Sequence, residues 1–290
     1  MAEKEVKLMK GNEAIAHALI RCGADAFFGY PITPQTEIIE TLSALKPWET
    51  TGMVVVQAES EVASINMVYG GAGAGKRCVT TSSSPGVSLM QEGISYMAGA
   101  EIPGVIGQMM EKVVLPDEKP RLSDEEVKKR YPWATFGRTP DRDPNIMTSL
   151  ELKPEVMEER NLALQAKYEE IRNNEVRYET QQCEDADYII VSFGSAARIG
   201  EKAMELAREE GLKVGLFRPI TLWPFPTKQI EELAKNKKGI LVSEFNAGQM
   251  VEDVRLAVNG AIPVEHFGRL GGIVPSPEEI VDALKTKLVK

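Results

Sequence analysis

The sequence predicts an α/β protein with a doubly wound parallel sheet, followed by a second, smaller α/β domain. Helix-like and strand-like segments alternate over roughly the first hundred residues. A stretch rich in proline and charge then interrupts the pattern, and the alternation resumes near residue 184. Strands that alternate with helices are typical of parallel sheets that carry helices on both faces.

In the first part of the chain, residues 12–23 and 36–45 have the apolar spacing of helices. A short apolar strand at 24–31 lies between them and ends at glycine and proline. The first helix is expected to bury one face and to end at Gly23; that face consists of Ala14, Ile15, Ala18, Leu19 and Cys22. The next expected elements are a strand at 52–60, a helix at 61–71, a strand with a polar loop at 77–86 and a helix at 87–101.

The middle of the chain has few strand signals and reads as one long charged helix over Pro154 to Tyr178. After it come a strand that ends at Phe193, a helix from about 197 to 210, and further alternating segments. We therefore expect a first domain at 1–107, a linker with the charged helix at 108–183, and a second domain at 184–290.

The overall charge excludes some classes of function. The chain has 290 residues and a formal net charge of −9. An acidic chain without a basic block is a poor partner for nucleic acid or anionic membranes. No apolar run approaches the ~18 residues that a membrane span needs, and the N-terminal residues are too charged for a signal peptide. A cytoplasmic location is expected.

The cysteine and histidine residues suggest no metal site. Cys22, Cys78 and Cys183 form no CxxC pair, which is typical of a reducing compartment. This chain alone therefore cannot hold a four-cysteine iron–sulfur cluster. His17 and His266 lack the spacing of metal ligands, and no G-x-S-x-G elbow indicates a serine triad.

The segment "GGAGAGKR" has the G-x4-G-K spacing of a phosphate loop, from Gly70 through Gly75 and Lys76. A phosphate loop should follow a strand and should have Ser or Thr after the lysine. Here the segment follows an expected helix, and Arg77 takes the hydroxyl position. We interpret it as a helix-to-strand connection in which glycine allows close packing.

Three polar loops follow expected strands: Tyr30–Thr33, Gln57–Glu61 and Thr81–Gly86. Open parallel sheets bind ligands at the carboxyl ends of their strands. Each loop alone is compatible with an ordinary capped turn, and Glu59 and Glu61 are compatible with solvated acids at a helix start. Together the loops predict one polar rim.

Several motifs resemble those of the α-type subunit of 2-oxoacid:ferredoxin oxidoreductases. They are "GNEAIAHALIRCGADAFFGYPITPQTEI", the series from "QAESEVASINMVYGG" through "TTSSSPGVSLMQEG", and "RPITLWPFP" with "EFNAGQM". The resemblance covers about residues 8–106 and 184–275. It is nearest to the 2-oxoisovalerate (branched-chain) or 2-oxoglutarate type.

This resemblance implies an enzyme that uses thiamine diphosphate. The family decarboxylates a 2-oxoacid oxidatively, passes electrons to ferredoxin and forms an acyl-CoA. The first domain would be the pyrimidine-binding half of the cofactor site, and the second would resemble the C-terminal domain of transketolase. That second domain would serve assembly, with Gly248 and Arg218 as packing and interface residues.

The resemblance also implies the site residues. Glu61, with Glu59 as the weaker candidate, would bind a ring nitrogen of the aminopyrimidine and stabilise its imino tautomer. Thr33 would lie beside the cofactor and the substrate carboxylate, with its backbone held extended by Pro31 and Pro34. Glu61 and Thr33 are thus the expected catalytic residues; the expected cofactor-binding residues are Tyr30, Pro31, Ile32, Thr33, Glu61, Ser83 and Ser84.

The chain departs from the family pattern near Ile106–Gly107. A stretch of about seventy residues, with a substrate-binding arginine and the last strands of the sheet, is missing there by comparison with the family pattern. Either the chain has a true internal deletion or residues are absent from the sequence. We expect a chain break, or an edge that a partner covers, at this point.

The resemblance implies partner subunits as well. No GDG…N pattern is present, so a β-type subunit should bind the diphosphate and magnesium. A further subunit should carry the iron–sulfur clusters and deliver electrons to ferredoxin, and the complex should take a 2-oxoacid and CoA. Two alternatives stay open: a transketolase-like or synthase component, and a catalytically silent scaffold with the same fold.

Overall fold

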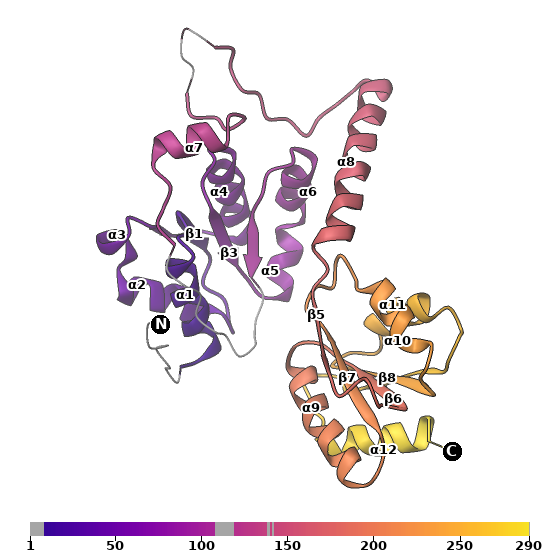
Figure 1. Cartoon of the computed structure of the whole chain (residues 1–290). Coiled ribbons are helices and arrows are strands. Elements are labelled where there is room, and N and C mark those ends of the chain that lie inside the picture. The colour runs from indigo at the N-terminus through magenta and orange to yellow at the C-terminus, as the bar shows by residue number, and fades with distance from the viewer. Residues whose placement is uncertain (1–8, 108–118, 138–139, 141, 290) are drawn as a thin grey trace. The chain divides into compact units, whose positions relative to one another are not determined.

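The computed structural model describes residues 9–107, 119–137, 140 and 142–289, without the side chain of Ser84. The chain divides into two compact units, Met1–Pro154 and Glu155–Lys290. Each unit has its own sheet and its own hydrophobic core, and Figure 1 labels the elements. The predicted α/β class is confirmed.

The sheet of the first unit has four strands in the order β2-β1-β3-β4, and every pair is parallel. The strands are short because glycine, proline and polar loops end them. The elements of this unit are α1 (Gly11–Arg21), β1 (Ala26–Gly29), α2 (Thr36–Leu45), α3 (Pro47–Thr50), β2 (Val54–Gln57), α4 (Glu61–Gly73), β3 (Cys78–Thr81), α5 (Ser84–Leu89), α6 (Gln91–Gly99), β4 (Val105–Gly107) and α7 (Asp124–Arg130).

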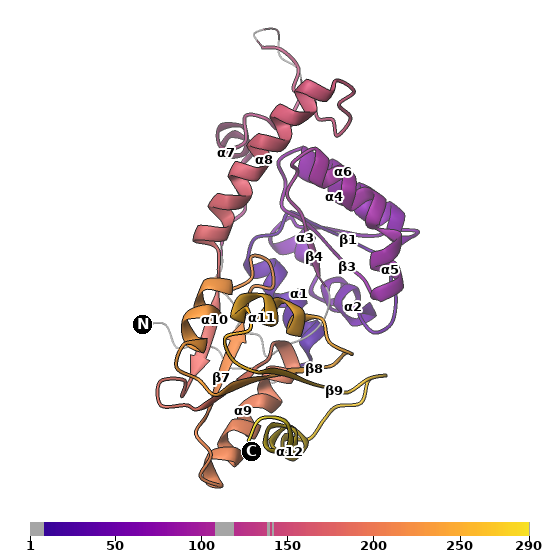
Figure 2. The same cartoon turned by 90° about the vertical axis from the view of Figure 1, so that its right-hand side faces the viewer.

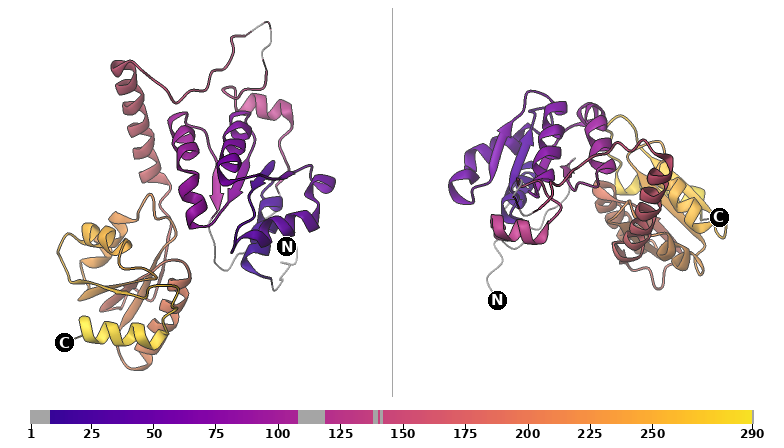
Figure 3. Two further views of the ribbon diagram at one scale, coloured as in Figure 1. Left: turned by 180° about the vertical axis from the view of Figure 1, so that it is seen from behind. Right: turned by 90° about the horizontal axis from the view of Figure 1, so that it is seen from above.

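Helices cover both faces of this sheet. On one face, Leu42 of α2 packs with Phe27 of β1, and both are fully buried. On the other face, Ile65 of α4 and Met97 of α6 pack over Cys78 of β3. Figure 3 shows α4 and α6 together along the sheet. Alternate residues of each strand therefore contact different helix layers.

Two local predictions in the first unit need correction. In α1, Ala14 is buried and Ile15 and Leu19 pack against the core as predicted, but Cys22 is exposed, whereas Asn12 and Ala16 are buried. The single helix expected at 87–101 begins earlier and divides at Met90 into α5 and α6.

The glycine-rich segment supports the packing interpretation rather than a phosphate loop. α4 continues through Gly70 and Gly71 to Gly73. A Cβ atom on Gly71 would lie 2.5 Å from the Sγ atom of Cys78. Glycine is therefore required there because the end of α4 lies directly against β3.

Residues 119–137, which we call the strap, belong to the first unit and contact the loops of its sheet. The carboxylate of Asp25, only 4% exposed, accepts a hydrogen bond from Nε of Arg121 at 2.8 Å. It also accepts the backbone N–H of Arg77 at 2.9 Å. The Arg121 guanidinium donates in addition to the carbonyl of Thr51 at 3.3 Å. A buried acid thus ties the strap to two loops of the first sheet.

The predicted break near Ile106–Gly107 lies at the limit of the described chain. Ile106 and Gly107 belong to β4 and pair with Thr80 and Thr81 of β3. The residues that follow, 108–118, lie outside the described residues. The domain limits at 107 and 183 stay a prediction.

The sheet of the second unit has the order β5-β7-β6-β8-β9, in which β5 is antiparallel and the other pairs are parallel. The elements of this unit are α8 (Pro154–Asn174), β5 (Tyr178–Gln181), β6 (Tyr188–Val191), α9 (Gly194–Glu209), β7 (Val214–Pro219), α10 (Thr227–Ala234), β8 (Gly239–Glu244), α11 (Met250–Val258), β9 (Val264–Gly268) and α12 (Pro277–Lys287).

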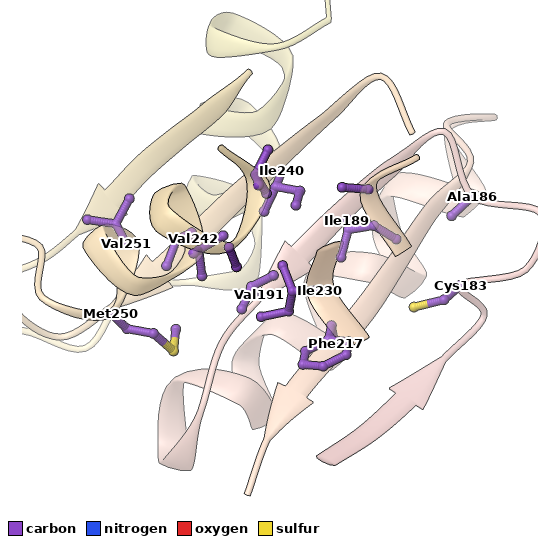
Figure 4. Packing of buried hydrophobic residues seen from close by; sticks show 14 residues of the cluster. Cys183, Ala186, Ile189, Val191, Phe217, Ile230, Ile240, Val242, Met250 and Val251 are labelled. Carbon is purple, nitrogen blue, oxygen red and sulfur yellow. The ribbon is translucent and has the colours of Figure 1, made fainter. Parts of the chain in front are cut away.

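Helices cover both faces of this second sheet, with α10 and α11 on one side and α9 and α12 on the other (Figure 2). Under α10 and α11 the core contains Val191, Ile230, Val242 and Met250, which belong to one cluster of buried side chains (Figure 4). Under α9 and α12 a separate cluster includes Leu241 of β8. The strands are apolar on both sides, as buried parallel strands are.

The motif "EFNAGQM" forms a cap for α11. The carboxylate of Glu244, 1% exposed, accepts the backbone N–H groups of Met250 at 2.9 Å and Val251 at 3.0 Å. Gly248 has a φ of +110°, a conformation that side chains rarely adopt. Arg218 of β7 donates to Glu179 of β5 at 2.9 Å.

The sequence did not predict the strand β5, because its residues, "YETQ", are polar and mostly exposed and show no alternating pattern. It lies at an edge of the sheet and joins by backbone pairing with β7. The charged helix α8 is correspondingly shorter than predicted and ends at Asn174.

The strap yields a prediction for stability. Arg121→Met should lower the free energy of unfolding by about 2 kcal/mol, because it removes the shorter ion pair of the buried Asp25 carboxylate and leaves only Arg77, whose Nε lies 3.6 Å away. Urea unfolding of the purified protein measures the loss. Lys76→Met is the control, since its partner Asp124 is largely exposed and such pairs contribute at most about 1 kcal/mol. An equal loss in both variants would contradict the role of Asp25.

Candidate functional site

The three polar loops leave the first sheet at the same edge. β1 lies between β2 and β3, with Ala26 paired to Val54 on one side and to Cys78 on the other. Because the three strands are parallel, the loops after Gly29, Gln57 and Thr81 emerge side by side. This edge is the predicted polar rim.

Glu61 lies at the start of α4 and is buried, with 5% of its surface exposed. Ser60 caps the helix by accepting the N–H of Ala63 at 3.1 Å. The side chain of Glu61 makes no hydrogen bond or ion pair with the described part of the chain. Glu59, in contrast, is exposed to solvent. The positive end of the helix favours a negative charge at this point. The structure thus separates the two candidate acids by burial.

The loop that starts α5 lies directly against Glu61. A Cβ atom on Gly86 would lie 1.9 Å from Oγ of Ser82 and 2.8 Å from Oε1 of Glu61, so only glycine fits. The hydroxyls of Ser82 and Ser83 are buried and have no hydrogen-bond partner within the described residues. The side chain of Ser84 lies outside the described part.

Thr33 is exposed, in a turn that the backbone N–H of Gln35 closes by donating to the carbonyl of Ile32 at 2.9 Å. This hydrogen bond closes a turn over residues 32–35, and the extended backbone predicted for Thr33 itself stays a prediction. The side chain of Gln35, 3% exposed, donates to the carbonyl of Tyr30 at 2.8 Å. It also accepts the hydroxyl of Thr81 at 2.6 Å.

The other side of this turn is held by α1. Asn12 donates to the carbonyl of Pro34 at 2.8 Å and to the carboxylate of Glu37 at 2.9 Å. Lys10 also donates to Glu37, and these two hydrogen bonds hold the pKa of Glu37 below its ordinary value. An open hollow of about 670 Å³ lies between α1 and Thr33, and Glu61 is not among the residues that line it.

These residues fit a ligand with hydrogen-bond donors. A buried carboxylate and two buried hydroxyls without partners are costly unless a bound group completes their hydrogen bonds. Ring nitrogens and amino groups can do so. Sequence analysis missed Gln35, Asn12 and Ser82, although Gln35 and Ser82 lie inside the motifs "YPITPQTE" and "TTSSSPG". Among the described residues, no group of three or more His, Cys, Asp or Glu side chains could hold a metal ion.

Two family models match the chain. Residues 17–116 match the model described as pyruvate flavodoxin/ferredoxin oxidoreductase, thiamine diphosphate-binding. Residues 186–280 match the model described as pyruvate:ferredoxin oxidoreductase core domain II. The two matches fall on the first and second sheets, respectively.

Curated relatives match nearly the full chain. The ketoisovalerate oxidoreductase subunit VorB of Methanothermobacter thermautotrophicus is 36% identical, with 96% of this chain and 97% of the relative covered. The 2-oxoglutarate synthase subunit KorA of Methanothermobacter marburgensis is 27% identical, with 97% and 98% covered.

Two solved structures have a similar fold. The 2-oxoglutarate:ferredoxin oxidoreductase from Magnetococcus marinus superposes with a TM-score of 0.77 at 24% identity, and this chain covers 65% of that chain. An inactive split-gene transketolase superposes with a TM-score of 0.58 at 13% identity, covering 96% of this chain and 98% of that one.

The parallel α/β sheet of the first unit, matched by the thiamine diphosphate-binding model, defines a subunit of the thiamine diphosphate-binding class. The similarity to VorB over nearly the whole chain then shows that the protein belongs to the family of 2-oxoacid:ferredoxin oxidoreductase subunits.

The alignment with VorB runs over 345 positions against the 290 residues of this chain, which leaves at least 55 positions without a counterpart here. The predicted loss near Ile106–Gly107 stays a prediction. Within the described residues no helix is both long and apolar enough to cross a membrane.

The packing at Gly86 yields a prediction. Gly86→Ala should lower the free energy of unfolding by roughly 1–3 kcal/mol, because the added methyl group collides with Ser82 and Glu61. The control is Gly70→Ala, within α4, where a Cβ atom meets nothing within 4 Å. That variant should be neutral or more stable by up to about 1 kcal/mol. Thermal unfolding compares the two, and a neutral Gly86→Ala would refute the close approach.

Proposed function

We propose that this chain supplies the pyrimidine-binding half of a thiamine diphosphate site in a 2-oxoacid:ferredoxin oxidoreductase. The single observation that carries the proposal is the buried Glu61 carboxylate, which has no partner among the described residues and lies at a parallel strand end. Thiamine diphosphate, when bound, supplies the carbon nucleophile for decarboxylation of the 2-oxoacid.

Glu61 would hold a ring nitrogen of the pyrimidine through a charge-assisted hydrogen bond. Such bonds are strong where water is excluded, and Glu61 is nearly inaccessible to water. The positive end of the α4 helix dipole favours a negative charge at this position. Ser82 and Ser83 would complete the polar wall around the ring.

Thr33 would contact the substrate. Its loop is held on one side by Asn12 and on the other by Gln35, so the exposed hydroxyl is positioned before any ligand arrives. A donor that is ordered beforehand loses little entropy on binding. A backbone N–H or hydroxyl at a strand end is suited to a carboxylate such as that of a 2-oxoacid.

The partners follow from what this chain does not contain. A β-type subunit would bind the diphosphate and magnesium, and a further subunit would hold the iron–sulfur clusters that reduce ferredoxin. CoA would be the acyl acceptor. The higher identity to VorB than to KorA favours a branched-chain 2-oxoacid as substrate. The composition and the scattered cysteines support a cytoplasmic location, and domain limits at 107 and 183 remain part of the proposal.

A silent scaffold is the second candidate, because at least 55 aligned positions of VorB have no counterpart here. Purification of the complex with its partner chains, followed by viologen reduction with branched-chain 2-oxoacids and CoA, distinguishes the two. Reduction that depends on thiamine diphosphate supports the enzyme. A complex that binds the cofactor but reduces nothing with any 2-oxoacid would favour the scaffold, or a synthase that transfers the acyl group without ferredoxin.

Glu61→Gln tests the site directly. It should lower viologen reduction by about 10²-fold or more, because a neutral amide cannot serve as the proton acceptor. Calorimetry should show weaker thiamine diphosphate binding in the same complex. Glu59→Gln is the matched control, two residues away and exposed. If the two variants behave alike, Glu61 has no catalytic role.

A further inference from the structure

Gln35 makes hydrogen bonds to residues of two different loops of the candidate site. Its buried amide donates to the carbonyl of Tyr30 and accepts from the hydroxyl of Thr81. Tyr30 follows β1, whereas Thr81 is the last residue of β3. One side chain therefore joins two of the three loops that form the polar rim.

Thr81 and Ser82 face opposite sides of the sheet. Side chains alternate along a strand, so consecutive residues point to different helix layers. Thr81 meets Gln35 on the side of α2, and Ser82 meets Gly86 and Glu61 on the side of α4 and α5. The end of β3 thus lies between the turn that contains Thr33 on one side and the residues Ser82 and Glu61 on the other.

The two hydrogen bonds of Gln35, which we call the link, restrict the movement of both loops. The amide of Gln35 uses its oxygen and its nitrogen in separate hydrogen bonds inside a buried environment. Loss of either partner would leave a buried polar group unsatisfied, which costs more than a surface hydrogen bond does. The turn and β3 must therefore hold their relative positions or break these bonds together.

We propose that Gln35 is a positioning residue, which locks the Tyr30–Pro34 turn to the end of β3 and so sets Thr33 relative to Ser82 and Glu61. The proposal rests on the proposed function, because it assigns Thr33 and Glu61 to one ligand. Gln35 acts through Tyr30 and Thr81, and not by touching the substrate itself.

The test uses the assembled complex with Thr81→Val, which removes the hydroxyl and keeps the shape. Thr80→Val is the matched control: Thr80 precedes Thr81 in β3, is equally buried and has a hydroxyl without a partner among the described residues. Thr81→Ser keeps the hydroxyl and serves as the conservative rescue. Gln35→Met removes the other half of the link.

Hydrogen exchange of peptides that cover residues 29–37, measured without cofactor, reports on the turn itself. Thr81→Val and Gln35→Met should each speed exchange there about tenfold, which corresponds to one buried hydrogen bond. Thr80→Val and Thr81→Ser should exchange like the unmodified complex. Equal exchange in Thr81→Val and Thr80→Val would overturn the proposal.

Kinetics give the second measurement. At saturating thiamine diphosphate and 2-oxoacid, kcat should fall about tenfold in Thr81→Val and in Gln35→Met. The double variant should be no worse than Gln35→Met alone, since Thr81→Val removes one of the two hydrogen bonds that Gln35→Met already removes. A fall confined to KM, or fully additive losses, would contradict positioning. If the unmodified complex binds no thiamine diphosphate, the proposed function fails, whereas the exchange result still decides the role of Gln35.

Discussion

The proposed site depends on one buried carboxyl group, that of Glu61, which has no hydrogen-bond partner among the described residues. Glu61 stands at the start of α4, almost out of reach of water, and the described residues offer it no hydrogen-bond donor. Its helix dipole compensates part of the cost of burial, and the rest calls for a ligand with donors of its own. Gly86 and Ser82 form a wall against this carboxylate, so its position is set by close packing.

The parallel sheet places Glu61 at the carboxyl ends of its strands, where open sheets bind ligands. Three adjacent strands end at one edge, and each contributes a short polar loop. Gln35 and Asn12 hold the turn with Thr33, while the strap closes the opposite part of the unit around Asp25. Buried polar groups that are fully satisfied give rigidity, whereas the hydroxyls of Ser82 and Ser83 at this strand end have no partner among the described residues.

The sequence predicted those features that depend on the local order of apolar and polar residues. Alternating apolar segments predicted the parallel sheets, and the strand-end loops predicted the rim. It failed for β5, a polar edge strand that joins the sheet by pairing with β7, and for part of the buried face of α1, where Asn12 is buried and Cys22 is exposed. The link from Gln35 to Thr81 could not be read from spacing, because 46 residues separate the two side chains.

The most direct measurement is a structure of the assembled complex loaded with thiamine diphosphate. The account predicts that a pyrimidine ring nitrogen lies within about 3 Å of a carboxylate oxygen of Glu61, with the hydroxyls of Ser82 and Ser83 against the same ring. A ring bound elsewhere, while Glu61 still faces only Gly86 and Ser82, would contradict it.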